Sequence, residues 1–245
     1  MDAGTKACSE SKASLAYEGA NDFEGAERTY RSILDRRPKF ASRIHLANTL
    51  FKQGRWRQAR LEIERYIADA PSDAERQWGY DQLAVIALHR DRANDVLEYA
   101  RHQPPEGYHD QEVLLALRQS DLAHADRLLA VRPQPADRGQ RANHRLEHYV
   151  RGERALAAGD SAAAIALFQS AVAERTPMYA IDWYEDCLAR AYLRLEKKDE
   201  AIGEYRRVLS IYPHLAPAWH GLAKAYAVKG DSASEAASFA KVAEL

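Results

Sequence analysis

Two histidines and a glutamate stand at a spacing that metal chemistry can use. His144, Glu147 and His148 form the pattern H-x-x-E-H. Histidines four residues apart share one face of a helix and can bind one zinc ion, with the glutamate as general base for peptide hydrolysis. A working site needs a third ligand, for which Asp182 or Glu185 could be proposed. Nothing around these acids supports that role, and 9 His with 36 acidic residues make a chance match easy. A zinc hydrolase is therefore a remote alternative.

No other motif predicts catalysis. The sequence contains no G-x-G-x-x-G, no G-x-x-x-x-G-K-[ST] and no G-x-S-x-G pattern. Cys8 and Cys187 lie far apart without C-x-x-C spacing, which favours structural or incidental thiols. We expect a protein that is not an enzyme, with no catalytic residues, no metal site and no cofactor.

The charge balance argues against a nucleic-acid partner. The chain has 35 Lys+Arg and 36 Asp+Glu, so it lacks the cationic excess of a basic nucleic-acid binder. Residues 28–65 hold eleven basic residues against three acids, a patch that could steer an acidic partner. Helical periodicity spreads these side chains over several faces, and no aromatic residues interleave as a stacking platform. A solvated, Arg-rich surface is the simpler interpretation.

The distribution of apolar residues predicts no membrane insertion. The first 19 residues lack the apolar run of about 7–15 residues of a secretory signal. Nothing approaches the roughly 18 consecutive apolar residues of a spanning helix, and the mean hydropathy is −0.55. The default expectation is a cytoplasmic protein, with a removed targeting segment as the open alternative.

Internal repetition predicts the elements that must position any functional residue. The segment LARAY at 188–192 recurs as LAKAY at 222–226, an offset of 34 residues. A small residue, an aromatic or aliphatic residue and a proline then recur in order, as in Ala201, Tyr205 and Pro213. The small positions that mark each second helix are Ala26, Ala59, Val96, Ala125, Ala164, Ala201 and Ala236. Repeats of this length indicate stacked helix pairs, since one pair alone cannot bury its apolar face.

These segments resemble tetratricopeptide repeats, most clearly LANTLFKQGRWRQA at 46–59 and LARAYLRLEKKDEA at 188–201. The small residue of the first helix, helix A, is matched at Ala47, Ala84, Ala189 and Ala223. The resemblance implies an all-α fold, a right-handed αα-superhelix of about seven helix pairs with degenerate middle units. We expect one solenoid over 1–245, with N-terminal units at 7–131, an irregular linker at 132–143 and C-terminal units at 144–245.

Local signals refine the expected helix ends. Gly54, Gly159 and Gly230 are predicted in the turns within repeats, where a left-handed residue ends a helix easily. Asp160 and Asp231 follow as N-caps. The last unit is expected to present a polar outer face at Asp231, Ser232, Ser234, Glu235 and Ser238, as a terminal repeat requires.

The resemblance implies a non-enzymatic scaffold that binds a peptide segment or a partner helix in the concave groove lined by helix A. Asn48 matches the asparagine with which peptide-binding members hold a ligand backbone, although an ordinary polar groove residue is the alternative. The candidate binding residues are Asn48, Lys52, Trp78, His89, Trp183, Arg190, Arg194, His220 and Lys224.

Several of these candidates have a second interpretation. Arg190, Arg194 and Lys224 could hold a carboxylate or phosphate, or be solvated charges paired with Asp186 or Glu185. Trp78 and Trp183 could anchor a partner or pack between repeats.

The carboxylate clamp of chaperone-tail binders is not matched. Ile44 stands where the clamp has lysine, and Asp81 and Gln82 stand where positive charge is needed. A wider alternative is a regulatory or assembly module of a larger bacterial signalling, secretion or envelope-assembly protein. Self-association into a homo-oligomer is a further alternative.

Overall fold

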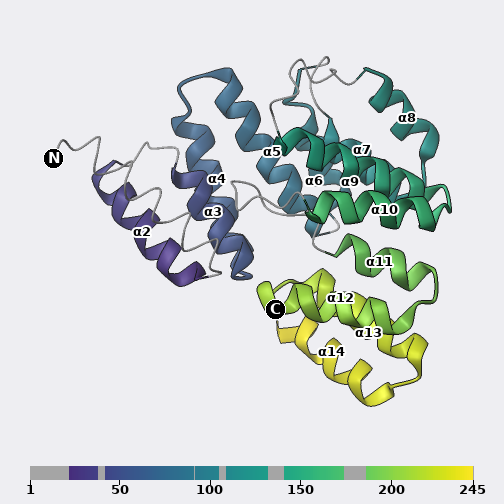
Figure 1. Cartoon of the computed structure of the whole chain (residues 1–245). Helices are drawn as coiled ribbons and strands as arrows, with labels where there is room; N and C mark the ends of the chain where they lie inside the picture. Colours follow the sequence, from purple (N-terminus) through teal and green to yellow (C-terminus); the bar gives the residue numbers. More distant parts are fainter. Residues whose placement is uncertain are drawn as a thin grey trace.

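The computed structural model describes residues 22–37, 42–90, 92–104, 109–131, 141–173 and 186–244, without the side chains of 141–145. Every regular element in these ranges is a helix, which confirms the all-α prediction (Figure 1). The helices are α2 (Phe23–Arg36), α3 (Ser42–Lys52), α4 (Trp56–Asp69), α5 (Asp73–His89), α6 (Ala93–Ala100), α7 (Asp110–Arg118), α8 (Leu122–Val131), α9 (Arg141–Ala157), α10 (Ser161–Ala173), α11 (Cys187–Arg194), α12 (Lys198–Ile211), α13 (Ala216–Lys229) and α14 (Ser232–Glu244).

The helices pair in sequence order and stack as a solenoid (Figure 1). Helix α3 packs on α4, α9 on α10 and α13 on α14, and each pair also packs on its neighbour. The odd-numbered helices touch one another, α5 with α7, α7 with α9 and α11 with α13, so they share one layer. The described residues contain six complete pairs and α2, the second helix of a further pair. Of the predicted linker, 132–140 lies outside them and α9 begins at Arg141.

A buried small residue marks the crossing of the helices. The small positions predicted to mark each second helix have no exposed surface in six of the units: Ala26, Ala59, Val96, Ala125, Ala164 and Ala201. Their large neighbours Tyr30, Phe168 and Tyr205 are at most 1% exposed. Small residues therefore let the backbones approach, and rings fill the space beside them.

The last pair departs from the sequence prediction. Ala236 is exposed, whereas Ser238 is 3% exposed and donates its hydroxyl to the Ser234 carbonyl at 2.8 Å. Helix α14 begins two residues after Gly230, as α10 begins two residues after Gly159. Counting from the turn therefore puts Glu235, not Ala236, at the equivalent of Ala164. The placement of Ser238 on the polar outer face was wrong, because this residue faces α13.

A similar hydrogen-bonded turn joins the two helices of each described pair. In five of the six pairs, a residue one or two positions after helix A is left-handed: Gly54 (φ 77°), Ser120 (62°), Gly159 (85°), Glu196 (56°) and Gly230 (84°). The N–H of the next residue returns to the carbonyl five residues earlier, in Arg55–Leu50, Arg92–Ala87, Asp121–Ala116, Asp160–Ala155, Lys197–Tyr192 and Asp231–Tyr226, at 2.9–3.0 Å. This bond is the long bond of a Schellman ending. The predicted glycine turns are confirmed.

The predicted N-caps are confirmed, and the degenerate middle keeps the same device. Asp160 Oδ1 accepts from the Ala163 N–H at 3.0 Å, and Asp231 Oδ1 accepts from the Ser234 N–H at 3.1 Å. Between α7 and α8, Asp121 Oδ1 accepts from the His124 N–H at 2.9 Å. The turn is therefore retained where the sequence pattern is weakest.

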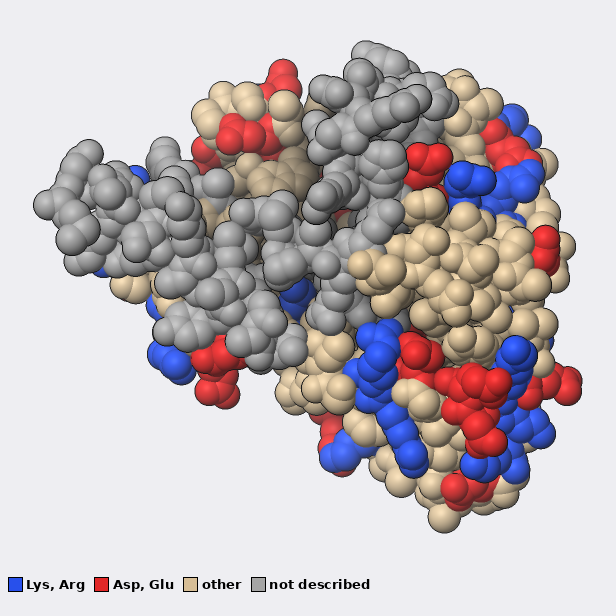
Figure 2. All heavy atoms as spheres, viewed as in Figure 1, with Lys and Arg blue, Asp and Glu red and all other residues tan. Residues whose placement is uncertain are grey.

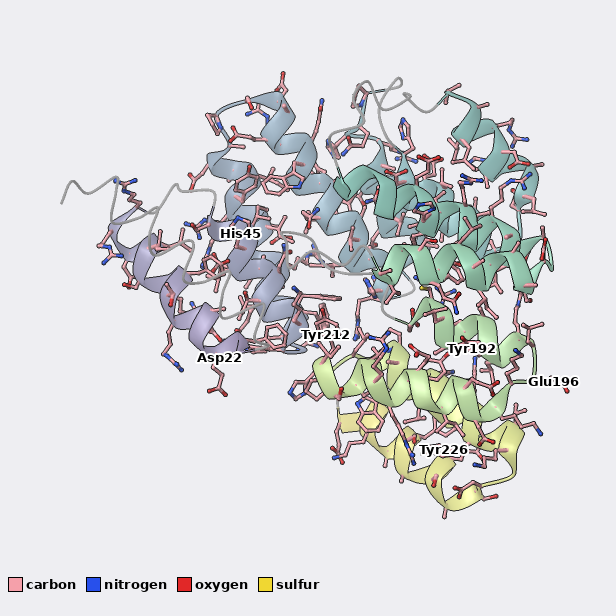
Figure 3. The ribbon with its side chains drawn as sticks, in the orientation of Figure 1. Asp22, His45, Tyr192, Glu196, Tyr212 and Tyr226 are labelled. Atoms are coloured by element: carbon pink, nitrogen blue, oxygen red, sulfur yellow. The ribbon has the colours of Figure 1, made fainter. Side chains whose placement is uncertain are left out.

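Contacts between distant units close the solenoid on itself. The Phe23 ring stacks on Tyr212, with centroids 6.0 Å apart, and packs against the C-terminal apolar cluster. Lys52 Nζ lies 5.9 Å from the Phe23 centroid and 6.0 Å from that of Tyr212. Figure 3 shows Tyr212 at the end of α12 that faces α2 and α3. We call Phe23, Lys52, Gly54, Tyr212 and His214 the clasp, because a Cβ at Gly54 would meet His214.

The non-glycine turns predict a stabilising substitution. Glu196 is exposed and left-handed, a conformation that disfavours any residue with a Cβ. We expect Glu196→Gly to raise the free energy of unfolding by about 0.5–1 kcal/mol. Glu200→Gly, at an exposed position inside α12, should lower it by about 1 kcal/mol. Urea unfolding measures both, and a loss at both sites would contradict the turn geometry.

The clasp predicts a difference between two glycines that share the same backbone conformation. Gly54→Ala and Gly230→Ala both place a Cβ in the left-handed region, at a cost of about 1–2 kcal/mol. Only at Gly54 would the Cβ lie 2.8 Å from His214 Cβ, since nothing lies within 4 Å at Gly230. We expect Gly54→Ala to lose more stability in urea unfolding. Adding His214→Gly should remove the excess, and equal losses in the two alanine variants would contradict the contact.

Candidate functional site

The layer of odd-numbered helices contains a pocket of about 630 Å³. Residues near the ends of α5, α7, α9 and α11 line it, together with the first three turns of α13. Five of the predicted binding residues meet here: His89, Arg190, Arg194, His220 and Lys224. The pocket therefore gathers residues from four successive helix pairs and the α5 end.

Arg190 forms a buried ion pair in the wall of the pocket. Its Nη1 donates to Glu153 Oε2 at 3.1 Å and its Nη2 donates to Glu153 Oε1. Its Nε donates to Asp186 at 3.4 Å, and its Nη2 also approaches the Tyr149 hydroxyl at 3.5 Å. The Glu153 side chain is 5% exposed and that of Arg190 27%. Arg190 is thus bound to α9, and the predicted pairing with Asp186 is present.

Local electrostatics keep this pair ionised. Burial would raise the pKa of Glu153, but the charge of Arg190 and its hydrogen bonds, with Arg118 near by, hold that pKa below its ordinary value. Burial would lower the pKa of Arg190, but Glu153 and Asp186 raise it well above its ordinary value. The bidentate hydrogen bonding between these opposite charges compensates for the free energy that their desolvation costs.

His89 contributes no charge to the pocket at neutral pH. Burial, followed by the charges of Arg118 and Arg190, lowers the pKa of His89 to about 3. Its ring lies against Phe51, with centroids 5.2 Å apart. The imidazole is therefore neutral, and it acts as a polar aromatic wall.

Arg194 and Arg118 are held at helix ends by backbone carbonyls. Arg194 Nη1 donates to the Leu156 carbonyl at the end of α9. Arg118 Nη1 donates to the Leu88 carbonyl at the end of α5, at 2.8 Å. A cation in this position stabilises the negative end of a helix. Each guanidinium keeps further N–H groups for other partners.

Lys224 and His220 lie on α13, and both are exposed. The His220 ring meets Phe239 edge-on, with centroids 5.7 Å apart. In the described part of the chain, no carboxylate lies within ion-pair distance of Lys224. These two side chains form the α13 side of the pocket.

The remaining predicted residues lie elsewhere. Asn48 is buried at 1% exposure, and Lys52 belongs to the clasp. Trp78 packs edge-on against Tyr66, with centroids 5.7 Å apart, which is the inter-repeat packing weighed above. Trp183 lies outside the described residues. Their role in binding stays a prediction.

The sequence reasoning missed three charged residues of the pocket: Arg90, Arg118 and Glu153. The repeat position of Arg118 was a usable signal. It stands two residues before Ser120 in its turn, and the same position holds Lys52 before Gly54 and Arg194 before Glu196. Glu153 had no signal of its own, since only the fold brings it to Arg190.

Metal chemistry gains no support where side chains are described. No group of three or more His, Cys, Asp and Glu in that part of the chain could hold a metal ion. Glu147 lies 3.9 Å from Arg151 in an exposed pair. The side chain of His144 and the proposed third ligands Asp182 and Glu185 lie outside the description. Likewise, no helix from α2 to α14, as far as its residues are described, is both long and apolar enough to cross a membrane.

Stacked helix pairs with one turn geometry and a pocket in the inner layer define a helical-repeat protein. Two family models described as tetratricopeptide repeat match the chain, one at residues 17–79 and one at 149–216 and 188–245. The chain belongs to the tetratricopeptide repeat family.

Among curated proteins, none matches the chain significantly. Several solved structures are similar over nearly the whole chain. The crystal structure of MamA protein is 17% identical, with a TM-score of 0.35, and covers 98% of this chain and 92% of that one. A tetratricopeptide repeat protein from Parabacteroides merdae is 14% identical, with a TM-score of 0.47 and coverage of 98% and 93%. The TPR2AB domain of yeast Sti1, in a pHSP90 complex, is 15% identical, with a TM-score of 0.42 and coverage of 98% and 90%.

The buried ion pair predicts unequal losses at two arginines. Arg190→Met leaves Glu153 buried without its partner, so we expect a loss of about 3–5 kcal/mol in the free energy of unfolding. Arg194→Met removes one bond to a carbonyl and should lose about 1 kcal/mol. Adding Glu153→Leu should restore part of the Arg190→Met loss. Urea unfolding measures the series, and similar losses at both arginines would contradict the pairing.

His89 predicts acid sensitivity of the fold. The pKa of about 3 in the folded state is below the unfolded value near 6.5, so only the unfolded chain binds this proton as the pH falls. Stability from this group is complete above pH 6.5 and declines below it. Between pH 7 and pH 5, the wild type should lose up to about 2 kcal/mol more than His89→Gln.

His45 also lowers the stability of the fold as the pH falls, because burial and the charge of Lys52 lower its pKa to about 4. The His89→Gln variant therefore keeps part of the acid sensitivity, and combining it with His45→Gln should remove more. Urea unfolding at each pH measures the difference. Parallel curves for the wild type and His89→Gln would contradict a neutral, buried His89.

Proposed function

We propose that the protein is a non-catalytic interaction scaffold that binds a segment of a partner protein in the inner-layer pocket. Tetratricopeptide repeat proteins are generally interaction modules of this kind. The observation that carries the proposal is the convergence of five predicted binding residues on one pocket of about 630 Å³. Residues separated by more than 130 positions in the chain reach it only because the helices stack.

The lining suits a polypeptide. Apolar side chains can receive the side chains of a segment, and they are Leu117, Leu156, Leu193, Leu215, Pro217 and Val242. Arginine and lysine N–H groups beside them can bind its carbonyls or carboxylates. A mixed wall of this kind gives affinity through burial and register through polar contacts.

The surface of the molecule also has a largely uncharged region and a charged region. On the face shown in Figure 2, the surface over α10 is largely uncharged, and charged side chains gather over α11 to α14. The helices that supply Arg190, Arg194 and Lys224, α11 and α13, belong to this charged region. We infer that the partner contacts these helices most closely.

Filling the pocket tests this function. Ala157 is half-buried and lines the pocket, and Ala158 is exposed beside it and does not. We expect Ala157→Phe to lose captured partner proteins in an affinity purification from cells, and Ala158→Phe to keep them. The same captured proteins at equal abundance for both variants would contradict the assignment.

A further inference from the structure

We propose that the pocket selects an acidic segment, with several side-chain carboxylates of the partner bound by Arg118, Arg194, Lys224 and Arg90. The proposal rests on the function proposed above and names the chemistry of the bound segment.

The charge of the pocket is far from that of the whole chain. Five Arg and Lys side chains and two carboxylates line the pocket, an excess of three positive charges. The whole chain carries a net charge of −1. The pocket therefore carries a positive excess that the chain as a whole does not have.

Both carboxylates of the pocket are engaged by a single arginine. Glu153 and Asp186 bind Arg190. Within the described ranges, Arg90, Arg118, Arg194 and Lys224 have no ion pair. Among the described residues, these four cations therefore lack a direct ion pair.

Neutral groups fix three of these four cations in place. Arg118 and Arg194 each donate one N–H to a helix-end carbonyl. The Arg90 guanidinium lies over the Trp56 ring, 4.5 Å from its centroid. Such contacts hold a side chain without neutralising it, which lowers the entropy lost when a carboxylate binds.

Stabilisation of helix ends explains only part of this arrangement. The ends of α5, α7, α9 and α11 each carry about half a negative charge, which Arg118 and Arg194 oppose directly. Lys224 lies in the interior of α13 and not at the end of its own helix. The formal charge of four cations also exceeds these partial charges. A surplus therefore remains for a ligand.

The distribution of the cations favours several carboxylates over one anion. Arg90, Arg118, Arg194 and Lys224 belong to the ends or faces of four different helices. Because these side chains extend from four different helices, a segment with several carboxylates can engage more of them than a single anion can. Alternate side chains of an extended segment lie about 7 Å apart. Acidic side chains interspersed with aliphatic ones would match both the cations and the apolar wall.

Selection from a phage-displayed library of random dodecapeptides tests the proposal. The targets are the wild type, Arg118→Gln/Lys224→Gln, and Arg101→Gln/Arg151→Gln, a control with the same net charge whose exposed arginines do not line the pocket. We expect the wild type and the control to enrich peptides rich in Asp and Glu. A peptide selected on the wild type should bind the pocket variant about tenfold more weakly, and added salt should weaken its binding to the wild type.

Additional variants separate the possible failures. Lys224→Gln alone changes an exposed side chain without an ion pair, so a loss of binding there does not reflect misfolding. Selected peptides without acidic enrichment, or equal binding to the pocket variant and the control, would overturn the acidic selectivity and leave the scaffold function standing. No peptide enriched on the wild type over Ala157→Phe would overturn both.

Discussion

The turn within each helix pair is the constraint on which the rest of the structure depends. One left-handed residue and one N–H bond to the carbonyl five residues earlier fix where the first helix ends and how the second returns. Because the bond recurs in all six described pairs and the left-handed residue in five of them, the first helices end at comparable places along the stack. The ends of α5, α7, α9 and α11 consequently converge on one pocket. The site is a product of the repeated turn rather than of any single element.

Closure by the clasp changes how the stack behaves. In an open solenoid each repeat contacts only its neighbours, so stability is a sum of local terms. Here Phe23 of α2 packs on Tyr212 after α12, which links units almost 190 positions apart. Opening at this contact separates the first pairs from the last ones. The shape of the inner layer therefore depends on both ends of the described chain. At the clasp, the Lys52 ammonium lies near the rings of Phe23 and Tyr212.

The sequence predicted the architecture because its signals are local. Ala59 and Ala164 mark crossings, and Gly54 and Gly159 mark turns, through steric requirements that any tetratricopeptide pair shares. Ser120 and Glu196 were missed as turn residues because their left-handed conformation is imposed by the pair and is not a preference of those residue types. The error at Ala236 has a similar origin, since a small residue one position away attracted the assignment.

The pocket was predictable only in part because its chemistry depends on pairing across the stack. The repeat pattern brought out Arg190, Arg194 and Lys224 as a cluster, but it did not distinguish the three residues from one another. The structure separates them: Arg190 is bound to Glu153, Arg194 is held by a carbonyl, and Lys224 is exposed. No spacing rule indicates that Glu153 lies opposite Arg190, 37 residues away.

The buried pair also determines which charges remain available. Ion pairs in low dielectric lose much of their attraction to desolvation, so Arg190 and Glu153 add little net stability while both are present. Their consequence is local: Glu153 forms its ion pair with Arg190, and Arg118 acts on Glu153 and His89 only through its charge at longer range. The neutral state of His89 has the same cause, because burial beside two arginines disfavours a further proton. After burial, the charges of Arg118 and Arg190 lower the pKa of His89, and the same two charges favour a carboxylate in the pocket.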